Sequence, residues 1–219
     1  MFNIAIDGPS ASGKSSIAKA LAKKLNFTHI DTGAMYRAVG LACMQEGISL
    51  DNEKLCSQMA RDIKIELTAD GKIYLENEDV SDLIRHDKVG KAASMVSQYQ
   101  EVRENMVRLQ RKMAAKKGYV MDGRDITSVV LPDAEIKIFQ TADAKVRAQR
   151  RYQEFINQGL SVDFDDIYQD LLERDERDKN RSESPLIKVD DAIEIDTTYL
   201  SIDEVVALVL NLIESRNLV

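Results

Sequence analysis

The clearest chemical signal in the chain is a phosphate-binding loop, Gly8-Pro9-Ser10-Ala11-Ser12-Gly13-Lys14-Ser15, which fits the pattern G-x-x-x-x-G-K-[ST]. It follows an apolar run at 2–6 and precedes a helical pattern at 17–25, the strand–loop–helix context that the motif requires. Its glycines let backbone N–H groups point at phosphate oxygens, and the positive end of the next helix faces the same spot. Lys14 can reach the β- and γ-phosphates, and the Ser15 hydroxyl can bind Mg²⁺. The loop therefore predicts a nucleoside triphosphate site.

An acidic residue follows a second apolar strand pattern. Asp122 comes directly after Tyr119-Val120-Met121, which is the Walker-B arrangement of an acidic group that helps to position Mg²⁺. An aspartate at a strand end is often only a turn former, but the phosphate loop favours the metal role. We therefore predict that Ser15 and Asp122 lie beside Mg²⁺, with Asp122 acting through water.

Two sets of charged residues, mostly arginines, repeat at helical spacing. Such faces are usually salt-bridged outer surfaces, yet a phosphoryl-transfer enzyme also needs arginines to meet the charge on the transferring oxygens. The set nearer the middle of the chain could close over a triphosphate as a lid and supply arginine fingers in cis. That set is Arg147, Arg150 and Arg151, and the later set is Arg174, Arg177, Asp178 and Arg181.

Alternating strand and helix patterns indicate how these groups are brought together. Five strand patterns separated by helical ones are typical of a parallel sheet with helices on both faces, whose ligands bind beyond the carboxyl ends of the strands. The predicted strands are residues 2–7, 27–30, 119–121, 135–139 and 192–195. The predicted helices are 14–25, 34–46, 51–59, 89–93, 100–117, 144–157, 164–180 and 201–212, with Asp51, Asp143 and Ser201 as N-caps and Glu204 completing a capping box.

The pattern changes between residues 63 and 81. Ile63-Lys64-Ile65-Glu66-Leu67 alternates apolar and polar side chains, and strand character returns at Ile73-Tyr74-Leu75 after Ala69-Asp70-Gly71. An Asp-Gly pair between two such runs predicts a hairpin turn, and residues 78–81 predict a third short strand. We interpret this stretch as a small antiparallel sheet inserted into an α/β chain.

Composition narrows the classes of protein. The 219 residues, 44% apolar and 31% charged, suit one globular domain with an inserted subdomain. The net charge of −7 argues against a general nucleic-acid binder. No apolar run approaches about 18–20 residues and no signal-peptide pattern is present, so we expect no membrane partner and a cytoplasmic location. Cys43 and Cys56 are expected to be reduced core residues, and neither His29 nor His86 has neighbours at zinc-ligand spacing.

Four segments together resemble the bacterial cytidylate kinases. They are residues 8–16, 31–37 (D-T-G-A-M-Y-R), 122–125 (D-G-R-D) and 174–181 (R-D-E-R-D-K-N-R). The phosphate loop is common to many families, whereas the other three motifs in this order are far more specific, and the insertion at 63–81 resembles the extra segment of that family.

This resemblance implies a fold and its division into parts. The fold is an α/β, three-layer P-loop kinase fold with a five-stranded parallel sheet, a small antiparallel β insertion in the monophosphate-binding region and a short helical lid. The implied parts are an ATP-binding core at 1–31, 86–146 and 164–219, a monophosphate-binding region at 32–85 and a lid at 147–163.

The resemblance also implies an activity, the ATP-dependent phosphorylation of CMP and dCMP with Mg²⁺ by a monomer. Gly8 to Ser16 would hold ATP, and Lys14, Arg124, Arg150 and Arg151 would be catalytic. The residues implied for the monophosphate site are Thr32, Tyr36, Arg37, Ser94, Arg103, Arg124, Asp125, Arg174, Asp178 and Arg181.

Cytosine chemistry gives a partial independent check on that set. The base carries an exocyclic amino donor beside ring acceptors, so its pocket needs an acidic acceptor and a cationic donor together. Asp125 and Arg103 are the candidates for this pair. Uracil would present a carbonyl to Asp125 and be repelled, which is a basis for discrimination.

The remaining charged groups have simpler expected roles. Asp178 can accept from the ribose hydroxyls while Arg174 holds it. Arg37 and Arg124 suit the α-phosphate, because a guanidinium can bind two phosphate oxygens at once. Arg181 could serve either the base or the phosphate.

One segment departs from the family pattern. Gly and Thr often follow shortly after D-G-R-D in that family, whereas Ile126-Thr127-Ser128 follows here. Thr127 therefore stands where a glycine would give the backbone more freedom.

Two other functions stay open from the residues. A kinase for another small acceptor, such as UMP, AMP or shikimate, would share the phosphate loop. A nucleotide-binding switch of the GTPase type would need an N-K-x-D guanine motif, and Asp178-Lys179-Asn180-Arg181 has the wrong order.

Overall fold

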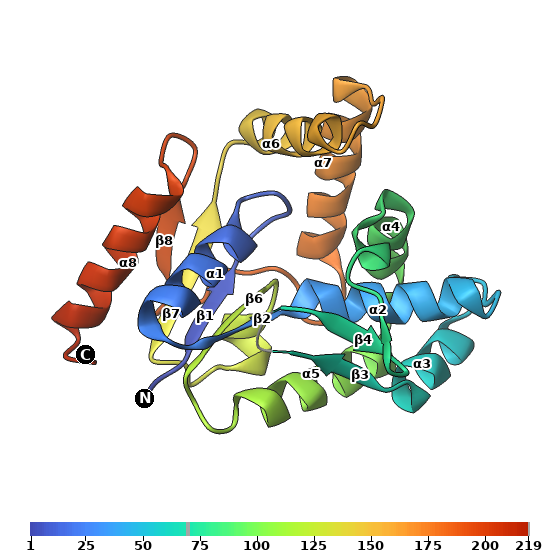
Figure 1. Cartoon of the computed structure of the whole chain (residues 1–219), viewed down its shortest axis with the longest axis horizontal. Coiled ribbons are helices and arrows are strands. Elements are labelled where there is room, and N and C mark those ends of the chain that lie inside the picture. Colours follow the sequence, from blue (N-terminus) through green and yellow to red (C-terminus); the bar gives the residue numbers. More distant parts are fainter. Residues whose placement is uncertain (69–70, 219) are drawn as a thin grey trace.

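The computed structural model describes residues 1–68 and 71–218, and a five-stranded parallel sheet in the order β2-β6-β1-β7-β8 forms its centre (Figure 1). The strands are β1 (Ile4–Asp7), β2 (Thr28–Asp31), β6 (Tyr119–Gly123), β7 (Ile136–Thr141) and β8 (Ile193–Asp196). β1 lies in the middle, and Ile4 is in register with Val120 on β6 and with Ile136 on β7. The predicted α/β class and the five-stranded parallel sheet are confirmed.

Helices cover both faces of this sheet. The covering elements are α1 (Lys14–Leu25), α5 (Gln100–Ala114), α8 (Ile202–Ser215) and a short π-helical turn, Ile126–Val130. Ile4 and Ile6 belong to the apolar cluster under α1 and α8, whereas Ala5 belongs to the cluster under α5 and the π-helical turn. Because side chains alternate along a strand, β1 supplies both cores, and the carboxyl ends of the strands meet at one edge.

The middle of the chain adds a helical body with a small sheet beside it. Its elements are α2 (Thr32–Gln45), α3 (Glu53–Asp62), β3 (Ile65–Leu67), β4 (Ile73–Leu75), β5 (Glu78–Asp79), a 3-10 turn at Leu83–Arg85 and α4 (Asp87–Val96). The three strands pair antiparallel in chain order, and β3 and β4 share one apolar core with α2. The predicted insertion with a third short strand is confirmed, while the predicted turn residues Ala69 and Asp70 lie outside the described residues.

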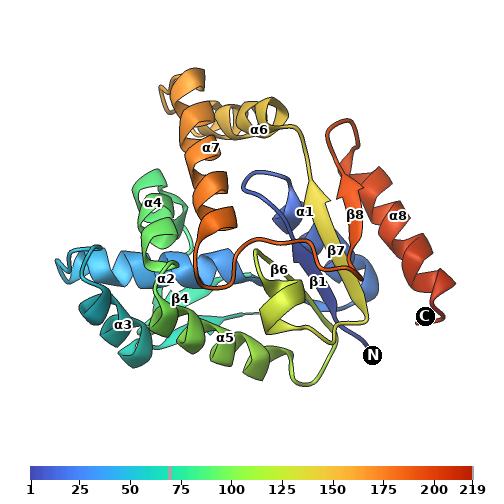
Figure 2. The same ribbon diagram turned by 180° about the vertical axis from the view of Figure 1, so that it is seen from behind.

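A helical hairpin stands beyond the carboxyl edge of the sheet (Figure 2). It consists of α6 (Ala144–Asn157) and α7 (Phe164–Asn180), which pack through Ala148, Phe155 and Ile167. This hairpin contains the segment 147–163 predicted to be the lid, and the predicted division into parts stays a prediction. No helix in the described part of the chain is long and apolar enough to cross a membrane.

Two helix starts differ from the predictions. Asp51 is not the N-cap of α3: Asn52 takes that role by accepting a hydrogen bond from the Leu55 N–H, so the helix begins at Glu53. α2 begins two residues earlier than expected because the Asp31 side chain caps it. In both cases the side chain that reaches the free N–H decides the boundary, and neighbouring candidates are hard to separate from sequence.

Other helix ends show the same dependence on local backbone. α5 ends at Ala114 rather than near Lys117, because Lys117 and Gly118 both have positive φ (58° and 85°) and turn the chain into β6. The predicted Asp143 N-cap and the capping box that begins at Ser201 are confirmed.

Gly40 allows α2 and α4 to lie close together, because a Cβ there would be 3.0 Å from the Ala92 Cβ and from the Ala93 nitrogen. Replacing Gly40 with Ala should destabilise the fold by about 1–3 kcal/mol, although alanine favours an isolated helix by about 1 kcal/mol. Thermal unfolding should show a lower Tm, by about 2–4 °C for each kcal/mol in a chain of this size. A Tm equal to or above that of the wild type would contradict the close packing.

Candidate functional site

The phosphate loop joins β1 to α1, and glycine shapes its backbone. Gly8 has φ 152° and Gly13 has φ 92°, and a Cβ at Gly8 would lie 1.9 Å from the Gln140 carbonyl oxygen. The Ser12 carbonyl accepts hydrogen bonds from the Gln140 side chain (2.5 Å) and the Thr197 hydroxyl (3.1 Å). The loop is therefore held by β7 and by the chain after β8, two contributions that the sequence did not reveal.

Lys14 is buried in the first turn of α1. Its Nζ donates to the Pro9 carbonyl at 2.8 Å and lies 3.4 Å from the Ser12 hydroxyl. Burial and, to a lesser extent, the charge of Arg124 lower the pKa of Lys14 to about 7, although the charge of Asp122 opposes both effects. A phosphate anion beside Nζ would favour its charged form, so the site is electrostatically suited to anions.

Asp122 lies on β6 beside the loop. Its Oδ2 accepts a hydrogen bond from the Ser15 hydroxyl at 2.7 Å, and its Oδ1 is 2.6 Å from the Nε2 atom of His29 on β2. The predicted proximity of Ser15 and Asp122 is confirmed. His29 was missed, because its contact with Asp122 comes from the pairing of β2 with β6 and no local sequence signal marks it.

A cleft of about 500 Å³ opens beside the loop, lined by residues of α2, α4, α7 and the end of β6. At one end it reaches Lys14, Ser15 and Asp122. The structure brings together all ten residues predicted for the monophosphate site. They are Thr32, Tyr36, Arg37, Ser94, Arg103, Arg124, Asp125, Arg174, Asp178 and Arg181.

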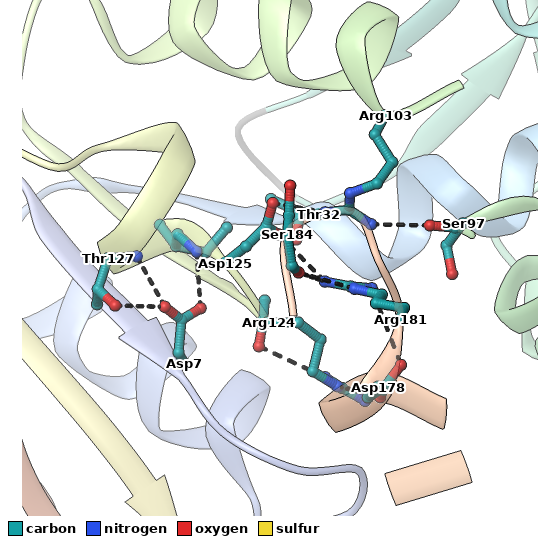
Figure 3. Close-up of polar contacts among 12 residues, drawn as sticks. Asp7, Thr32, Ser97, Arg103, Arg124, Asp125, Thr127, Asp178, Arg181 and Ser184 are labelled. Atoms are coloured by element: carbon teal, nitrogen blue, oxygen red, sulfur yellow. Dashed lines mark hydrogen bonds and ion pairs between the residues drawn. The ribbon is translucent and has the colours of Figure 1, made fainter. Parts of the chain in front are cut away.

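Asp125 and Arg103 form a buried ion pair in this cleft, as the base-reading argument predicted. Arg103 Nη2 donates to Asp125 Oδ2 at 2.5 Å, and Arg103 Nη1 donates to the Ser97 carbonyl at 3.0 Å (Figure 3). The Arg103 guanidinium lies 5.3 Å from the centre of the Tyr36 ring, within the range of a cation–π contact. Arg181 Nη2 is 3.9 Å from the other Asp125 oxygen. The acidic group is thus fixed between two cations.

Asp178 is held by Arg124 and not by Arg174, so the predicted partner is wrong. Arg124 Nε donates to Asp178 Oδ2 at 2.7 Å, because Arg124 extends from the end of β6 onto α7 and takes the place beside the carboxylate (Figure 3). Burial would raise the pKa of Asp178, but the charges of Arg124 and then Arg174 outweigh it and hold that pKa below its usual range. Asp178 is therefore an ionised acceptor at neutral pH.

Four polar atoms of the cleft have no hydrogen-bond partner among the described residues. They are Tyr36 Oη, Ser94 Oγ, Arg103 Nε and Arg174 Nε. Burial, together with the neighbouring charge of Arg124, lowers the pKa of Arg174 to about 10. Since buried polar atoms nearly always have partners, a hydrogen-bonding anionic ligand would suit these atoms.

A second hollow, of about 420 Å³, lies on the other side of the phosphate loop. Arg150 closes part of it, with Nη2 donating to the Thr197 carbonyl at 2.6 Å and Nη1 to the Ser12 carbonyl at 3.3 Å. Arg151 lines both hollows and lies over the Phe155 ring, 4.2 Å from its centre. The apolar lining is Ile17, Leu200, Ile202 and Val205, of which the segment after β8 was not predicted to be part of the site.

Arg147 differs from its expected place in a lid over the triphosphate. It is buried, forms an ion pair with Asp175 at 2.7 Å and donates to the carbonyls of Ser10 (3.0 Å) and Ala142 (2.9 Å). These contacts join α6 and α7 to the phosphate loop, so Arg147 supports the loop from the protein side.

Asp7 is a fully buried carboxylate that the sequence analysis did not single out. It accepts hydrogen bonds from the N–H groups of Ile126 (2.8 Å) and Thr127 (2.7 Å) and from the Thr127 hydroxyl (2.6 Å). Burial raises the pKa of Asp7 to about 6 despite these three donors. The one feature of the sequence that could have marked Asp7 is that it is a charged residue at the end of an apolar strand.

Comparison with known proteins agrees with this geometry. The family model for cytidylate kinase matches residues 4–215. A cytidylate kinase of Bacillus pumilus (strain SAFR-032) is 48% identical over 213 residues, covering 96% of this chain and 95% of the relative. One of Bacillus cereus (strain ATCC 10987 / NRS 248) is 44% identical over 215 residues, with coverage of 97% and 96%. Among solved structures, shikimate kinase from Acinetobacter baumannii in complex with shikimate has a TM-score of 0.50 at 18% identity, covering 100% of this chain and 96% of that one, a likeness of fold alone.

The raised pKa of Asp7 makes stability depend on pH. The group titrates near 3.8 in the unfolded chain and near 6 in the folded one. Its contribution to the free energy of unfolding is therefore fully present below pH 3.8 and is lost as the pH rises through about 6, a change of up to about 3 kcal/mol. Urea unfolding of the wild type and of Asp7→Asn across this window should give a difference that falls as the pH rises. A difference that does not vary with pH would contradict the assignment.

Proposed function

The chain belongs to the cytidylate kinase family, and we propose that its two hollows bind the two substrates of the ATP-dependent phosphorylation of CMP and dCMP. This nucleoside monophosphate kinase reaction needs a donor and an acceptor held in line at the transferred phosphoryl group. The proposal is carried by one observation: the ten acceptor residues line a single cleft that also reaches Lys14 and Ser15. We assign that cleft to the nucleoside monophosphate and the second hollow to the adenosine of ATP.

The donor side is the phosphate loop, residues 8–16, with the hollow next to it. Backbone N–H groups of the loop and the N-terminus of α1 would bind the phosphates, with Lys14 reaching the β- and γ-phosphates. The apolar side chains of Ile17, Leu200 and Ile202 offer the flat, dry contact that suits an adenine ring.

Mg²⁺ would be held beside Ser15 and Asp122. Their hydroxyl and carboxylate oxygens are donors that Mg²⁺ prefers, and the 2.7 Å contact keeps both groups at one place. No cluster of three His, Cys, Asp or Glu side chains within residues 1–68 and 71–218 has the arrangement of a metal site, so ATP and water would supply the other ligands and Asp122 would act through water. When bound, the ion neutralises charge on the β- and γ-phosphates.

The phosphate of the acceptor would lie among three arginines. Arg174 lines the cleft, its Nε has no hydrogen-bond partner among the described residues, and burial weakens its charged form, so an anion beside it would be favourable. Arg37 uses one nitrogen to donate to the Ile84 carbonyl at 2.9 Å, and its other donors are available to phosphate oxygens. Arg124 reaches the same cleft from the end of β6.

The base and ribose would lie deeper, next to the buried carboxylates. Asp125, oriented by Arg103, would accept from the exocyclic amino group of cytosine, and Arg103 would donate to the ring acceptors. Arg181 lies near both Asp125 and Asp178 and donates to the Ser184 carbonyl at 2.7 Å, which supports a place on the base side. Asp178, ionised and held by Arg124, would accept from the ribose hydroxyls.

Catalysis would consist of positioning and charge stabilisation, with no obligatory general base. Lys14 and Arg124 would meet charge on the transferring group from the loop and from β6. Arg151 lines both hollows, which supports a role beside the phosphoryl group as it passes between them. Arg150 would assist from the donor side, exchanging its contacts with loop carbonyls for phosphate oxygens.

The wider organisation is also part of the proposal. Residues 1–31, 86–146 and 164–219 would form the ATP-binding core, 32–85 the monophosphate-binding region, and 147–163 a lid that excludes water during transfer. We further propose a cytoplasmic monomer that acts on free nucleotides rather than on nucleic acids or membranes, supported by the net charge of −7.

Asp125→Asn should impair the use of CMP more than the use of UMP. The amide loses the charge that accepts from the cytosine amino group, and its NH₂ can donate to a uracil carbonyl, so kcat/KM for CMP should fall by about tenfold to a hundredfold and that for UMP by less. The measurement is ADP formation with each acceptor under ATP and Mg²⁺.

The ratio of the two kcat/KM values isolates base reading, because a smaller folded fraction lowers both values equally. Asp190→Asn, which removes an exposed carboxylate, is the matched control and should leave the ratio unchanged. Equal losses on CMP and UMP in Asp125→Asn would argue against the base-reading role.

A further inference from the structure

Asp125 lies on a short loop that is fixed on both sides by one residue of the central strand. On the near side, Gly123 of β6 is the register partner of Asp7 on β1. On the far side, the N–H groups of Ile126 and Thr127 donate to the Asp7 carboxylate at 2.8 and 2.7 Å (Figure 3). The chain before and after Asp125 is thus tied to the same point.

These ties also set the backbone of Asp125 itself. Its carbonyl accepts from the N–H groups of Val129 (2.9 Å) and Val130 (3.1 Å), which starts the π-helical turn, while its φ and ψ of −140° and 26° lie outside the helical region. The Asp7 carboxylate satisfies the first two N–H groups of that turn, the groups that no helical carbonyl can reach. The direction in which the Asp125 side chain leaves the loop, toward Arg103, depends on this arrangement.

Asp7 is at the same time the residue that precedes the phosphate loop. Gly8, the first loop glycine, follows it directly, and a Cβ at Gly8 would collide with the Gln140 carbonyl, so this point of the backbone has little room to shift. A single buried side chain therefore sets the distance between the donor loop and the segment that carries Asp125. Hydrogen bonds to an ionised carboxylate are among the stronger ones in proteins.

The side chain of Thr127 adds a third hydrogen bond between this loop and Asp7. Its hydroxyl donates to Asp7 Oδ2 at 2.6 Å, and that same oxygen accepts from the Thr127 N–H. Thr127 is 1% exposed, so no water competes for the bond. Without this hydroxyl, only the two backbone hydrogen bonds to Asp7 would remain.

We propose that Asp7 is a positioning residue for acceptor specificity, and that the Thr127 hydroxyl tightens its hold on the loop that carries Asp125. The inference rests on the proposed base-reading role of Asp125. Asp7 lines neither of the two hollows. It acts by keeping Asp125 in place relative to the phosphate loop. Weakening its hydrogen bonds to the loop that carries Asp125 should therefore change the choice of acceptor more than it changes the KM for ATP.

The test uses Thr127→Val, which keeps the shape of the side chain and removes the hydroxyl. We expect the KM for CMP to rise by about threefold to tenfold, and the CMP-to-UMP ratio of kcat/KM to fall by at least about threefold, the scale of one hydrogen bond to a charged group shared with other donors. The KM for ATP should change by less than about twofold. Thr127→Ser restores a hydroxyl and should return both acceptor values to within about twofold of the wild type.

Ser57→Ala is the matched control, since it removes a buried hydroxyl on α3, away from the cleft, and should leave the acceptor ratio unchanged. A Thr127→Val variant that loses only thermal stability, with an unaltered CMP-to-UMP ratio, would overturn the positioning role. If Asp125→Asn itself leaves the ratio unaltered, the base-reading proposal fails. If Asp125→Asn lowers the ratio and Thr127→Val does not, only the role of Asp7 and Thr127 fails.

Discussion

The site depends on a buried excess of positive charge. Arg103 and Arg124 are neutralised by Asp125 and Asp178, at 2.5 and 2.7 Å. Lys14 and Arg174 have no carboxylate within ion-pair distance among the residues that the structure describes, and burial lowers the pKa of Lys14 to about 7 and that of Arg174 to about 10. Burying an unpaired charge costs free energy, and in our proposal the phosphates of the two substrates would be the anions that offset this cost. The unpaired positive charges of Lys14 and Arg174 would therefore favour the binding of anionic ligands.

The neighbouring arginines explain why Asp125 and Asp178 are so tightly held. Each of Asp125 and Asp178 lies between two arginines, so neither can move without leaving a buried cation unpaired. In the proposed complex, Asp125 and Asp178 would form a rigid pair of acceptors for the base and the ribose, and the remaining arginine donors would bind the phosphate. Preorganised charges of this kind need little rearrangement when the transferring group becomes more negative, and this is the source of catalysis in sites without a general base.

Much of the fold and of the site could be predicted from local pattern, and the limits are physical. Strand–loop–helix periodicity located the phosphate loop, and the arginine spacing on α7 brought Arg174, Asp178 and Arg181 to one cleft. Which arginine holds Asp178 could not be predicted, because Arg124 reaches it across the fold. The contacts of His29 and Asp7 join residues that are far apart in the sequence, through strand pairing or a buried side chain. The local sequence pattern around each residue therefore gives almost no indication of them.

In our proposal, one cleft both binds the phosphate of the acceptor and recognises cytosine. The most direct test of this proposal is kcat/KM of the wild-type enzyme with saturating ATP and Mg²⁺ for CMP, dCMP, UMP, AMP and cytidine. We expect kcat/KM for CMP and dCMP to exceed that for UMP and AMP by at least about tenfold, the scale of one mismatched polar group, and cytidine, which has no phosphate, not to be measurably used. A rate with UMP or AMP equal to that with CMP would contradict the proposal.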